Sequence, residues 1–396
     1  MTPPLNPQRD ALRFIVVIGV CSFFADCTYE GSRSVIGPYL ATLQASGAVV
    51  GIITGLGELL GYVLRLFTGA AADVSGRYWT IILFGYCLQM ASVPALALTH
   101  SWPAAAALII LERIGKGIRN PPRDALLARA GKQMSGYGWA FGLHQALDQS
   151  GAMAGPLLVA AIVAVHENYR LAFAALAVPA VITVSLNIAA SRLCPASREV
   201  ESGPRSLTLT NLPGVFWLYL SGAALVAAGF ADYPLIAYHF ARVGIVPGDL
   251  IAVLYAIAMA AGGAASLILG RLFDQYGFVV LVVVTALSTL FAPLVFLGGF
   301  WFAAIGAGIW GVGMAVHESI IPAAVAPMVS SRRRASAFGL FTAGYGVFWF
   351  LGSMVIGLLY DRSIWLVVAF CVTAQLLAIP IFVTVGRYRR HWGRSR

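Results

Sequence analysis

Charged side chains inside long apolar stretches are the groups in this sequence that can do chemistry. Asp26, Glu30 and Arg33 recur at i, i+4 and i+7, a spacing that places them on one face of a helix. Ionisable residues are expensive in hydrocarbon and usually face a cavity or a partner. A carboxyl group can hold a proton in a dry cavity and release it beside a cation, which couples proton movement to a change of conformation. The expected proton-coupling residues are Asp26, Glu30, Glu58, Asp148 and Asp232.

A purely structural role is the alternative for these acids. Basic residues in the same stretches can pair with them permanently and only hold the helices together. The same cations can instead bind a carboxylate or phosphate group of a ligand. Histidines titrate near neutral pH and can carry protons or hydrogen-bond a ligand, and aromatic side chains can line an apolar cavity. The expected cavity residues are Arg33, Arg65, Arg113, Lys116, His144, His317, Glu318 and Tyr345.

The sequence lacks the residue patterns that are typical of metal, metalloprotease and ATP-binding sites. His144 and Asp148 are four residues apart and supply two metal ligands, but no Cys or His cluster completes a shell. His317-Glu318 is not followed by a His three residues later, so the helical metalloprotease pattern is missing. The sequence has no Gly-x-x-x-x-Gly-Lys-Ser/Thr loop, which argues against direct drive by ATP. We expect no metal, no cofactor and no catalytic residue, so the protein is predicted not to be an enzyme.

The chain is too apolar for a soluble globular protein. Its 396 residues are 59% hydrophobic and 11% charged, and the mean hydropathy is +0.83. Many apolar stretches reach the length of about 18 residues that crosses a membrane. The predicted fold is therefore an all-α integral membrane protein. Twelve spans are expected, at residues 12–40, 47–72, 78–99, 102–126, 136–164, 170–191, 212–240, 248–273, 277–299, 301–328, 335–360 and 363–386.

Lys and Arg accumulate in alternate connections between these spans. Arg170, Arg242 and Arg362 fall on the side of the membrane that has few basic residues. The positive-inside rule therefore predicts that both termini are cytoplasmic. Basic residues facing anionic lipid explain the net charge of +10 without a nucleic-acid partner. We expect a monomeric, multi-pass protein of a bacterial or archaeal cytoplasmic membrane, whose partners are protons, membrane lipid and a small-molecule substrate.

An internal repeat divides the chain. The motif at residues 69–77, Gly-x-x-x-Asp-x-x-Gly-Arg, recurs 201 residues later as Gly-x-x-x-Asp-x-x-Gly at 270–277. The segment Phe-Ala-Asp that ends at Asp26 likewise recurs at Asp232. A polar stretch at 193–211 separates six spans from six. We predict an N-terminal six-helix bundle at 12–192, a linker at 193–211 and a C-terminal six-helix bundle at 212–387, related by pseudo-twofold symmetry with the two aspartates near the axis.

These motifs resemble those of the major facilitator superfamily over nearly the whole chain. The 69–77 motif is similar to the family's loop between the second and third spans, and 270–277 to its weaker partner between the eighth and ninth. Arg113 in the fourth span is similar to the Arg-x-x-x-Gly-type motif of that helix in the family. Gly142, Gly151, Gly155 and Pro156 in the fifth span resemble the motif of its drug:proton antiporters. The resemblance implies a twelve-helix transporter that works by alternating access.

The repeated turns are expected to form a gate at the cytoplasmic face. Asp73 and Arg77 can pair with each other or cap neighbouring helix ends, and Asp124 can join the same clasp of charges. The expected gating residues are Gly69, Asp73, Gly76, Arg77, Asp124, Gly270, Asp274 and Gly277.

Secondary transport is the function that these patterns favour. We expect proton-coupled efflux of small amphipathic or drug-like compounds. One alternative is uptake of a small polar metabolite or organic anion, either coupled to protons or by facilitated diffusion. Another is a membrane sensor that keeps the scaffold of a transporter. The substrate itself depends on which side chains converge in the cavity, and a fold does not specify it.

Overall fold

Long apolar segments form helices along most of the chain in the computed structural model, which describes residues 7–133, 137–193, 212–325, 328–329 and 334–392. Within these ranges no residue is in a β-strand. Eleven helical stretches of the described chain are long and apolar enough to cross a membrane. They agree with eleven of the twelve expected spans. The remaining one, α4 (Trp102–Gln133), is 32 residues long but carries several charges in its middle.

The chain divides into two compact units, each made of two sequence segments. The first comprises Met1–Val35 and Val63–Gly203, and the second Ile36–Tyr62 and Pro204–Arg396. The C-terminal end of the first helix and the N-terminal half of the second thus belong to the second unit. The predicted linker at 193–211 lies outside the described residues except for Leu193. The predicted bundles at 12–192 and 212–387 therefore stay a prediction.

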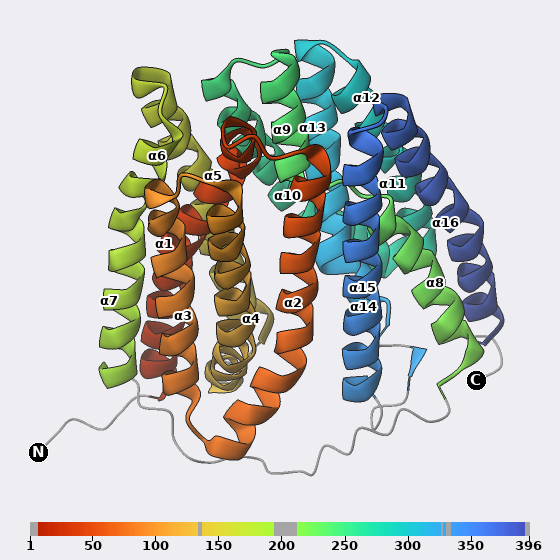
Figure 1. Cartoon of the computed structure of the whole chain (residues 1–396). Helices are drawn as coiled ribbons and strands as arrows, with labels where there is room; N and C mark the ends of the chain where they lie inside the picture. The colour runs from red at the N-terminus through yellow and green to blue at the C-terminus, as the bar shows by residue number, and fades with distance from the viewer. Residues whose placement is uncertain (1–6, 134–136, 194–211, 326–327, 330–333, 393–396) are drawn as a thin grey trace, which may run out of the picture. The chain divides into compact units, whose positions relative to one another are not determined.

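The first unit is built from helices of the N-terminal half. In it, α3 and α4 lie side by side (Figure 1), and Gly85 and Gly115 allow the approach of their backbones, because a Cβ on Gly85 would lie 2.8 Å from the carbonyl oxygen of Gly115. The helices contributing to this unit are α1 (Pro7–Thr42), α2 (Gly47–Ser75), α3 (Tyr78–Ala95), α4, α5 (Tyr137–His166), α6 (Tyr169–Ala175) and α7 (Ala177–Leu193), with a short 3-10 turn at Leu96–Leu98.

Helices of the second unit are more often interrupted. The span expected at 212–240 breaks at residues 229–232, where Pro234 near the start of the next helix favours an extended chain before it. The span expected at 301–328 contains a π-helical turn, Val316–Ile320. The helices are α8 (Gly214–Ala228), α9 (Tyr233–Val243), α10 (Gly248–Tyr276), α11 (Phe278–Ser288), α12 (Phe291–Leu297), α13 (Phe300–Ala315), α14 (Ile321–Ala323), α15 (Arg334–Tyr360) and α16 (Ile364–Trp392).

The two copies of the repeated motif have the same backbone geometry. Gly76 has a φ of 64° and Gly277 a φ of 61°, a region that favours glycine. The amide of Gly76 donates to the carbonyl of Ala72 at 2.9 Å, and that of Gly277 to Phe273 at 2.8 Å. Each turn therefore ends one long helix in the same way, as expected for a duplicated structural unit.

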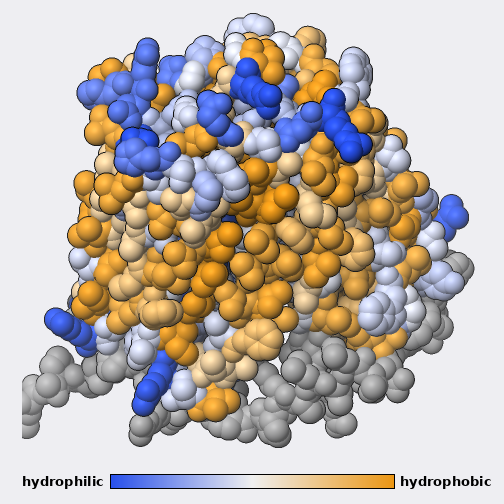
Figure 2. Space-filling view, viewed as in Figure 1, coloured by the Kyte–Doolittle hydropathy of each residue, from blue (hydrophilic) through white to orange (hydrophobic). Residues whose placement is uncertain are grey.

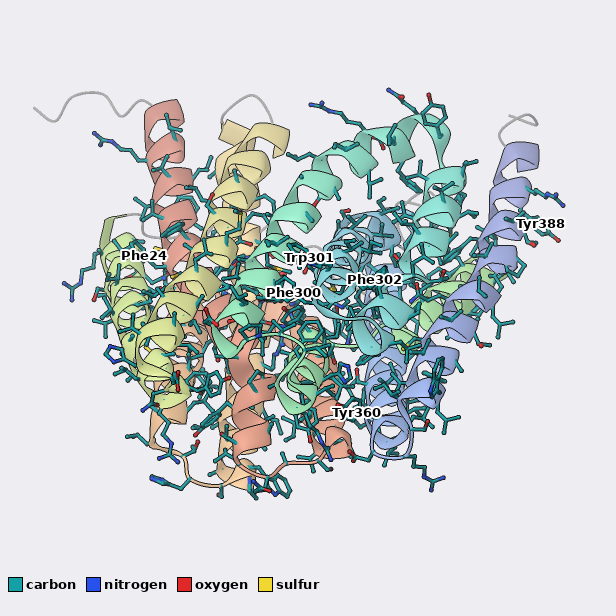
Figure 3. The ribbon with its side chains drawn as sticks, turned by 90° about the horizontal axis from the view of Figure 1, so that it is seen from above. Phe24, Phe300, Trp301, Phe302, Tyr360 and Tyr388 are labelled. Carbon is teal, nitrogen blue, oxygen red and sulfur yellow. The ribbon has the colours of Figure 1, made fainter. Side chains whose placement is uncertain are left out.

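Apolar side chains dominate the lipid-facing length of the helices. Figure 2 shows hydrophobic residues over the middle of the helices in view and hydrophilic residues gathered towards helix ends. At the start of α13, Trp301 and Phe302 are 76% and 57% exposed, and Figure 3 labels both. Aromatic residues are enriched where helices leave the hydrocarbon, so this position suits the membrane interface.

A polar latch fixes the α1–α2 connection within the second unit. Asp361, between α15 and α16, accepts hydrogen bonds from the backbone amides of Gly47 at 2.8 Å and Ala48 at 2.9 Å. These amides open α2, so the carboxylate caps that helix from the far end of the sequence. The hydroxyl of Tyr238 donates to the carbonyl of Ala45 at 2.9 Å and holds the same connection from α9.

Replacing Asp361 with alanine is expected to lower the free energy of unfolding by about 1 kcal/mol, because the first amides of α2 lose their cap. Thermal unfolding of the detergent-purified protein measures the change. Arg362→Ala is the matched control, since its neighbouring side chain is exposed and lies in the same connection. Equal melting temperatures for Asp361→Ala and the wild type would contradict the latch.

Candidate functional site

Two carboxyl groups meet inside the first unit. Asp26 on α1 and Asp148 on α5 lie close enough to each other for their carboxyl groups to interact electrostatically. Two carboxyls can share a hydrogen bond only when one of them carries a proton to donate. Asp26 is 7% exposed, and Oδ1 of Asp148 is buried with no hydrogen-bond partner among the described residues. The pair is therefore a place where the protein can hold one proton and exchange it.

Small residues bring the two helices of the pair together. A Cβ on Gly151 would collide with the backbone carbonyl of Phe23, and a Cβ on Gly155 with that of Cys27. These two contacts are one helical turn apart on both α1 and α5, and Asp26 lies between the two contacted residues of α1. Glycine is needed at both positions because only a helix face without side chains permits backbones to come this close.

Arg119 supplies a fixed positive charge beside the carboxyl pair. Its Nη2 lies 3.9 Å from Oδ1 of Asp26, and the residue is 1% exposed. Two residues of α3 hold it: Nε donates to Oε1 of Gln89 at 2.6 Å, and Nη1 donates to the hydroxyl of Tyr86 at 3.1 Å. Gln89 in turn donates to Oε1 of Glu112 at 2.8 Å. The guanidinium is thus held in place by groups other than the acid that it faces.

Several more cations gather around Tyr29, one turn along α1 from Asp26. Arg33 and Arg113 both donate to the hydroxyl of Tyr29, and Nζ of Lys116 lies 3.6 Å from the centre of its ring. Electrostatic coupling links Lys116 to both Glu30 and Asp26. The first unit thereby brings together most of the acids and bases that the sequence marks in the first, fourth and fifth spans.

Asp232 occupies a different setting in the second unit. It stands before the first residue of α9, and its two carboxylate oxygens accept from Nε1 of Trp349 at 3.0 Å and Oγ of Ser353 at 2.8 Å. Asp26, its counterpart in the repeat, lies inside the continuous helix α1. The two halves of the chain therefore have the same residue type at this position, but the backbone around it is helical in the first half and extended in the second.

The remaining candidates of the second unit surround Tyr345. Nδ1 of His317, in the π-helical turn, hydrogen-bonds to the hydroxyl of Tyr345, and the His317 ring packs against Phe230 at a centroid distance of 4.2 Å. Glu58 and Glu318 interact electrostatically with the same tyrosine. π-helical turns are rare and are often found at functional sites. This cluster is thus a second polar centre, lined by aromatic rings.

Comparison with known proteins decides the family. The model of the Major Facilitator Superfamily matches residues 18–240, more than half of the chain. The chain belongs to the Major Facilitator Superfamily. An uncharacterised protein of Mycobacterium tuberculosis (strain H37Rv) is 38% identical over 387 residues, which cover 96% of this chain and 94% of the relative. The Fosmidomycin resistance protein of Escherichia coli (strain K12) is 26% identical over 364 residues, 86% of this chain and 85% of the relative.

Solved structures confirm the fold. A variant of the nucleoside transporter NupG superposes with a TM-score of 0.80 at 14% identity, covering 94% of this chain and 99% of that one. At this identity the likeness shows the fold alone. Together with the family match, it makes this superfamily member a multi-pass membrane transporter of two six-helix bundles.

Two of the acids expected in the gate of this superfamily member, Asp73 and Asp124, each hydrogen-bond to a residue nearby in sequence. Oδ1 of Asp73 accepts from the hydroxyl of Tyr78 at 2.6 Å, and Arg77 stands at the N-terminus of α3 without a side-chain hydrogen bond to that helix end. Asp124 accepts from Nε and Nη2 of Arg123, its neighbour in sequence, at 3.0 and 2.9 Å. A gate formed by these residues stays a prediction.

Other expected residues have simpler surroundings. A Cβ on Gly69 would lie 3.4 Å from Cβ of Pro121, an ordinary contact with α4, whereas one on Gly270 would meet nothing within 4 Å. Nδ1 of His144 is buried and has no hydrogen-bond partner among the described residues. The roles expected of Arg65 in the cavity and of Asp274 in the gate remain predictions.

Sequence reasoning missed the residues that position the others. Gln89 joins Arg119 to Glu112, and a lone amide within an apolar span was the available signal. The rings of Tyr29 and Tyr86 each lie against a cationic side chain. A tyrosine in an apolar span can equally serve only for packing, so the sequence did not indicate this role. Asp361 was missed because a carboxylate in a loop does not show which helix it caps.

Proposed function

We propose that this member of the superfamily is a proton-coupled transporter that works by alternating access, in which the Asp26–Asp148 pair carries the proton. The observation that carries the proposal is the approach of the buried Asp26 to the partly buried Asp148 beside the fixed charge of Arg119. When the helices move, the distance between the two acids changes, and so does the tendency of the pair to hold a proton. Proton uptake and release are thereby linked to conformation.

Efflux of small amphipathic compounds is the proposed direction of transport. It is supported by the similarity of the fifth span to antiporter motifs and by a relative whose name is that of a drug-resistance protein. The transporter would then reside in a bacterial or archaeal cytoplasmic membrane as a monomer and use the inward proton gradient.

Everted membrane vesicles test coupling and direction together. Respiration acidifies the vesicle lumen, and a dye quenched by the gradient reports its loss. Adding fosmidomycin, a cationic dye or an organic acid to vesicles that contain the protein is expected to release part of the quenching for at least one compound, and not in vesicles from the host alone. Substrate movement at the same rate after the gradient is collapsed by an uncoupler would contradict proton coupling.

Uptake of a small organic anion is the second candidate. The observation in its favour is the gathering of Arg33, Arg113 and Lys116 around Tyr29. An anion bound there would favour the protonated state of the nearby pair, so that proton and anion would move in the same direction. In right-side-out vesicles, an acidic exterior would then drive accumulation of the anion.

A further inference from the structure

Arg119 is held by two uncharged side chains of α3. Its Nε donates to Oε1 of Gln89 at 2.6 Å, and its Nη1 donates to the hydroxyl of Tyr86 at 3.1 Å. Its Nη2 faces Oδ1 of Asp26 at 3.9 Å, which is longer than a hydrogen bond. Arg119 is 1% exposed and Gln89 is fully buried. The guanidinium is therefore anchored to α3, and its charge acts on Asp26 through space.

The backbones of α3 and α4 fix the position of Gln89 opposite Arg119. A Cβ on Gly85 would lie 2.8 Å from Cβ of Arg119, and a Cβ on Gly115 would lie 2.9 Å from Cβ of Gln89. Gly85 stands one turn before Gln89, and Gly115 stands one turn before Arg119, so the glycine of each helix faces the polar residue of the other. This reciprocal contact keeps the two polar side chains together for as long as the helices stay packed.

Glu112 orients the amide of Gln89. Nε2 of Gln89 donates to Oε1 of Glu112 at 2.8 Å, and this leaves Oε1 of Gln89 to accept from Arg119. An amide turned the other way would place its NH2 group, a donor, against a guanidinium that can only donate. The amide carries no charge, so Gln89 satisfies a buried cation without neutralising it. A carboxylate in the same place would cancel much of the field of Arg119 at Asp26.

Other charged side chains also surround the carboxyl pair. The charged and titratable groups that α1, α4 and α5 place around it are Cys21, Glu30, Glu112, Arg113, Lys116, Arg119, Arg123, Asp124 and His144. Helix α3 contains no Asp, Glu, Lys, Arg or His. Arg123 lies 2.9 Å from Asp124, and Lys116 is coupled to Glu30 as well as to the pair. Arg119 differs from both, because its hydrogen bonds go to the neutral groups of α3.

We propose that Gln89 is a positioning residue of proton coupling, which holds Arg119 in place with its charge intact and thereby sets the pH range over which the carboxyl pair takes up and releases a proton. The proposal rests on the proposed function and concerns the regulation of the same site. A positive charge favours the ionised carboxylate, so a closer charge moves proton release to lower pH, and a neutralised charge moves it to higher pH. Two changes at position 89 therefore have opposite effects.

Gln89→Leu removes both hydrogen bonds and keeps a side chain of similar size. Arg119 loses the acceptor of Nε and is expected to turn towards Asp26, so the midpoint of proton release moves about one pH unit lower. The measurement is infrared spectroscopy of the purified protein, in which the carbonyl band of the protonated pair is followed against pH. Gln375→Leu is the matched control, because Gln375 is also a fully buried amide but lies on α16 in the second unit. Its midpoint is expected to equal that of the wild type.

Exchanging the amide and the acid tests the opposite effect. In Gln89→Glu/Glu112→Gln a carboxylate faces Arg119, the net charge is unchanged, and a hydrogen bond between positions 89 and 112 is kept. The midpoint is expected about one pH unit above that of Glu112→Gln alone, because the charge of Arg119 is neutralised. Gradient-driven flux in proteoliposomes is expected to shift its pH dependence in the same direction. A role of Gln89 in packing alone would lower the melting temperature of these variants and leave the midpoints unchanged.

Unchanged midpoints, or shifts of Gln89→Leu and the exchange variant in the same direction, would overturn the positioning role. If Gln89→Leu does not fold, the exchange variant and its Glu112→Gln reference decide the question. The proposed function fails in a different way. A carbonyl band that is lost in Asp26→Asn, with midpoints that ignore position 89, would overturn the role of Gln89 and leave proton coupling standing. A protein without a band that depends on Asp26 would overturn both.

Discussion

Replacing Asp26 or Asp148 with asparagine is expected to reduce gradient-driven transport at least tenfold and to leave exchange of substrate across the membrane largely intact. Asparagine has the shape of a neutral carboxyl and cannot release a proton. Its amide still donates to the remaining carboxylate, so the packing of α1 against α5 is kept. The variants therefore separate coupling from binding, which a loss of fold would not do.

The measurement uses proteoliposomes in two modes, net flux driven by a proton gradient and exchange of labelled substrate without a gradient. Asp249→Asn is the matched control, because it removes one carboxylate from the first turn of α10, outside the network around Asp26. It is expected to behave as the wild type in both modes. If Asp26→Asn and Asp148→Asn respond to the gradient as strongly as the wild type, the proton is carried elsewhere.

Adding a methyl group at the crossing of α1 and α5 is expected to disturb coupling without changing any charge. In Gly151→Ala and Gly155→Ala the new Cβ meets backbone carbonyl groups of Phe23 and Cys27, which cannot rotate away as a side chain could. The helices must separate, and overpacking of this kind costs about 1–3 kcal/mol. Both variants are expected to melt at lower temperature and to lose gradient-driven flux, because the two carboxyls move apart.

Gly308→Ala provides the control for this effect. Gly308 lies in α13, and a Cβ added there meets nothing within 4 Å. Alanine is a better helix former than glycine by up to about 1 kcal/mol, so this variant is expected to be as stable as the wild type or slightly more so. Coupling that survives in Gly155→Ala would show that the spacing of α1 and α5 does not control the proton.

The spans and the repeated turns were within reach of sequence reasoning. Apolar length predicts a helix that crosses a membrane, and the glycine of each repeated motif predicts a turn, here with φ of 64° at Gly76 and 61° at Gly277. Local pattern suffices in both cases because the structure is determined by neighbours in sequence. The interruption before α9 was missed, since Gly229 and Pro234 are both tolerated within membrane helices.

The candidate site was predictable as a set of residues and not as a set of contacts. Asp26 and Asp148 both stood out as charges in apolar stretches, but their meeting depends on the register between α1 and α5, which the backbone contacts of Gly151 and Gly155 fix. Asp232 looked equivalent to Asp26 by sequence. Its hydrogen-bond partners Trp349 and Ser353 come from α15. The sequence repeat does not show which residues of another helix contact an aspartate.

The shared proton of Asp26 and Asp148 is the central claim, and infrared spectroscopy of the purified protein tests it directly. A protonated carboxyl has a carbonyl band that an ionised carboxylate lacks, and the band shifts in heavy water. We predict this band at neutral pH in the wild type and in Asp249→Asn, and its loss or marked weakening in Asp26→Asn and Asp148→Asn. Absence of the band from the wild type, or an undiminished band in both variants, would contradict the claim.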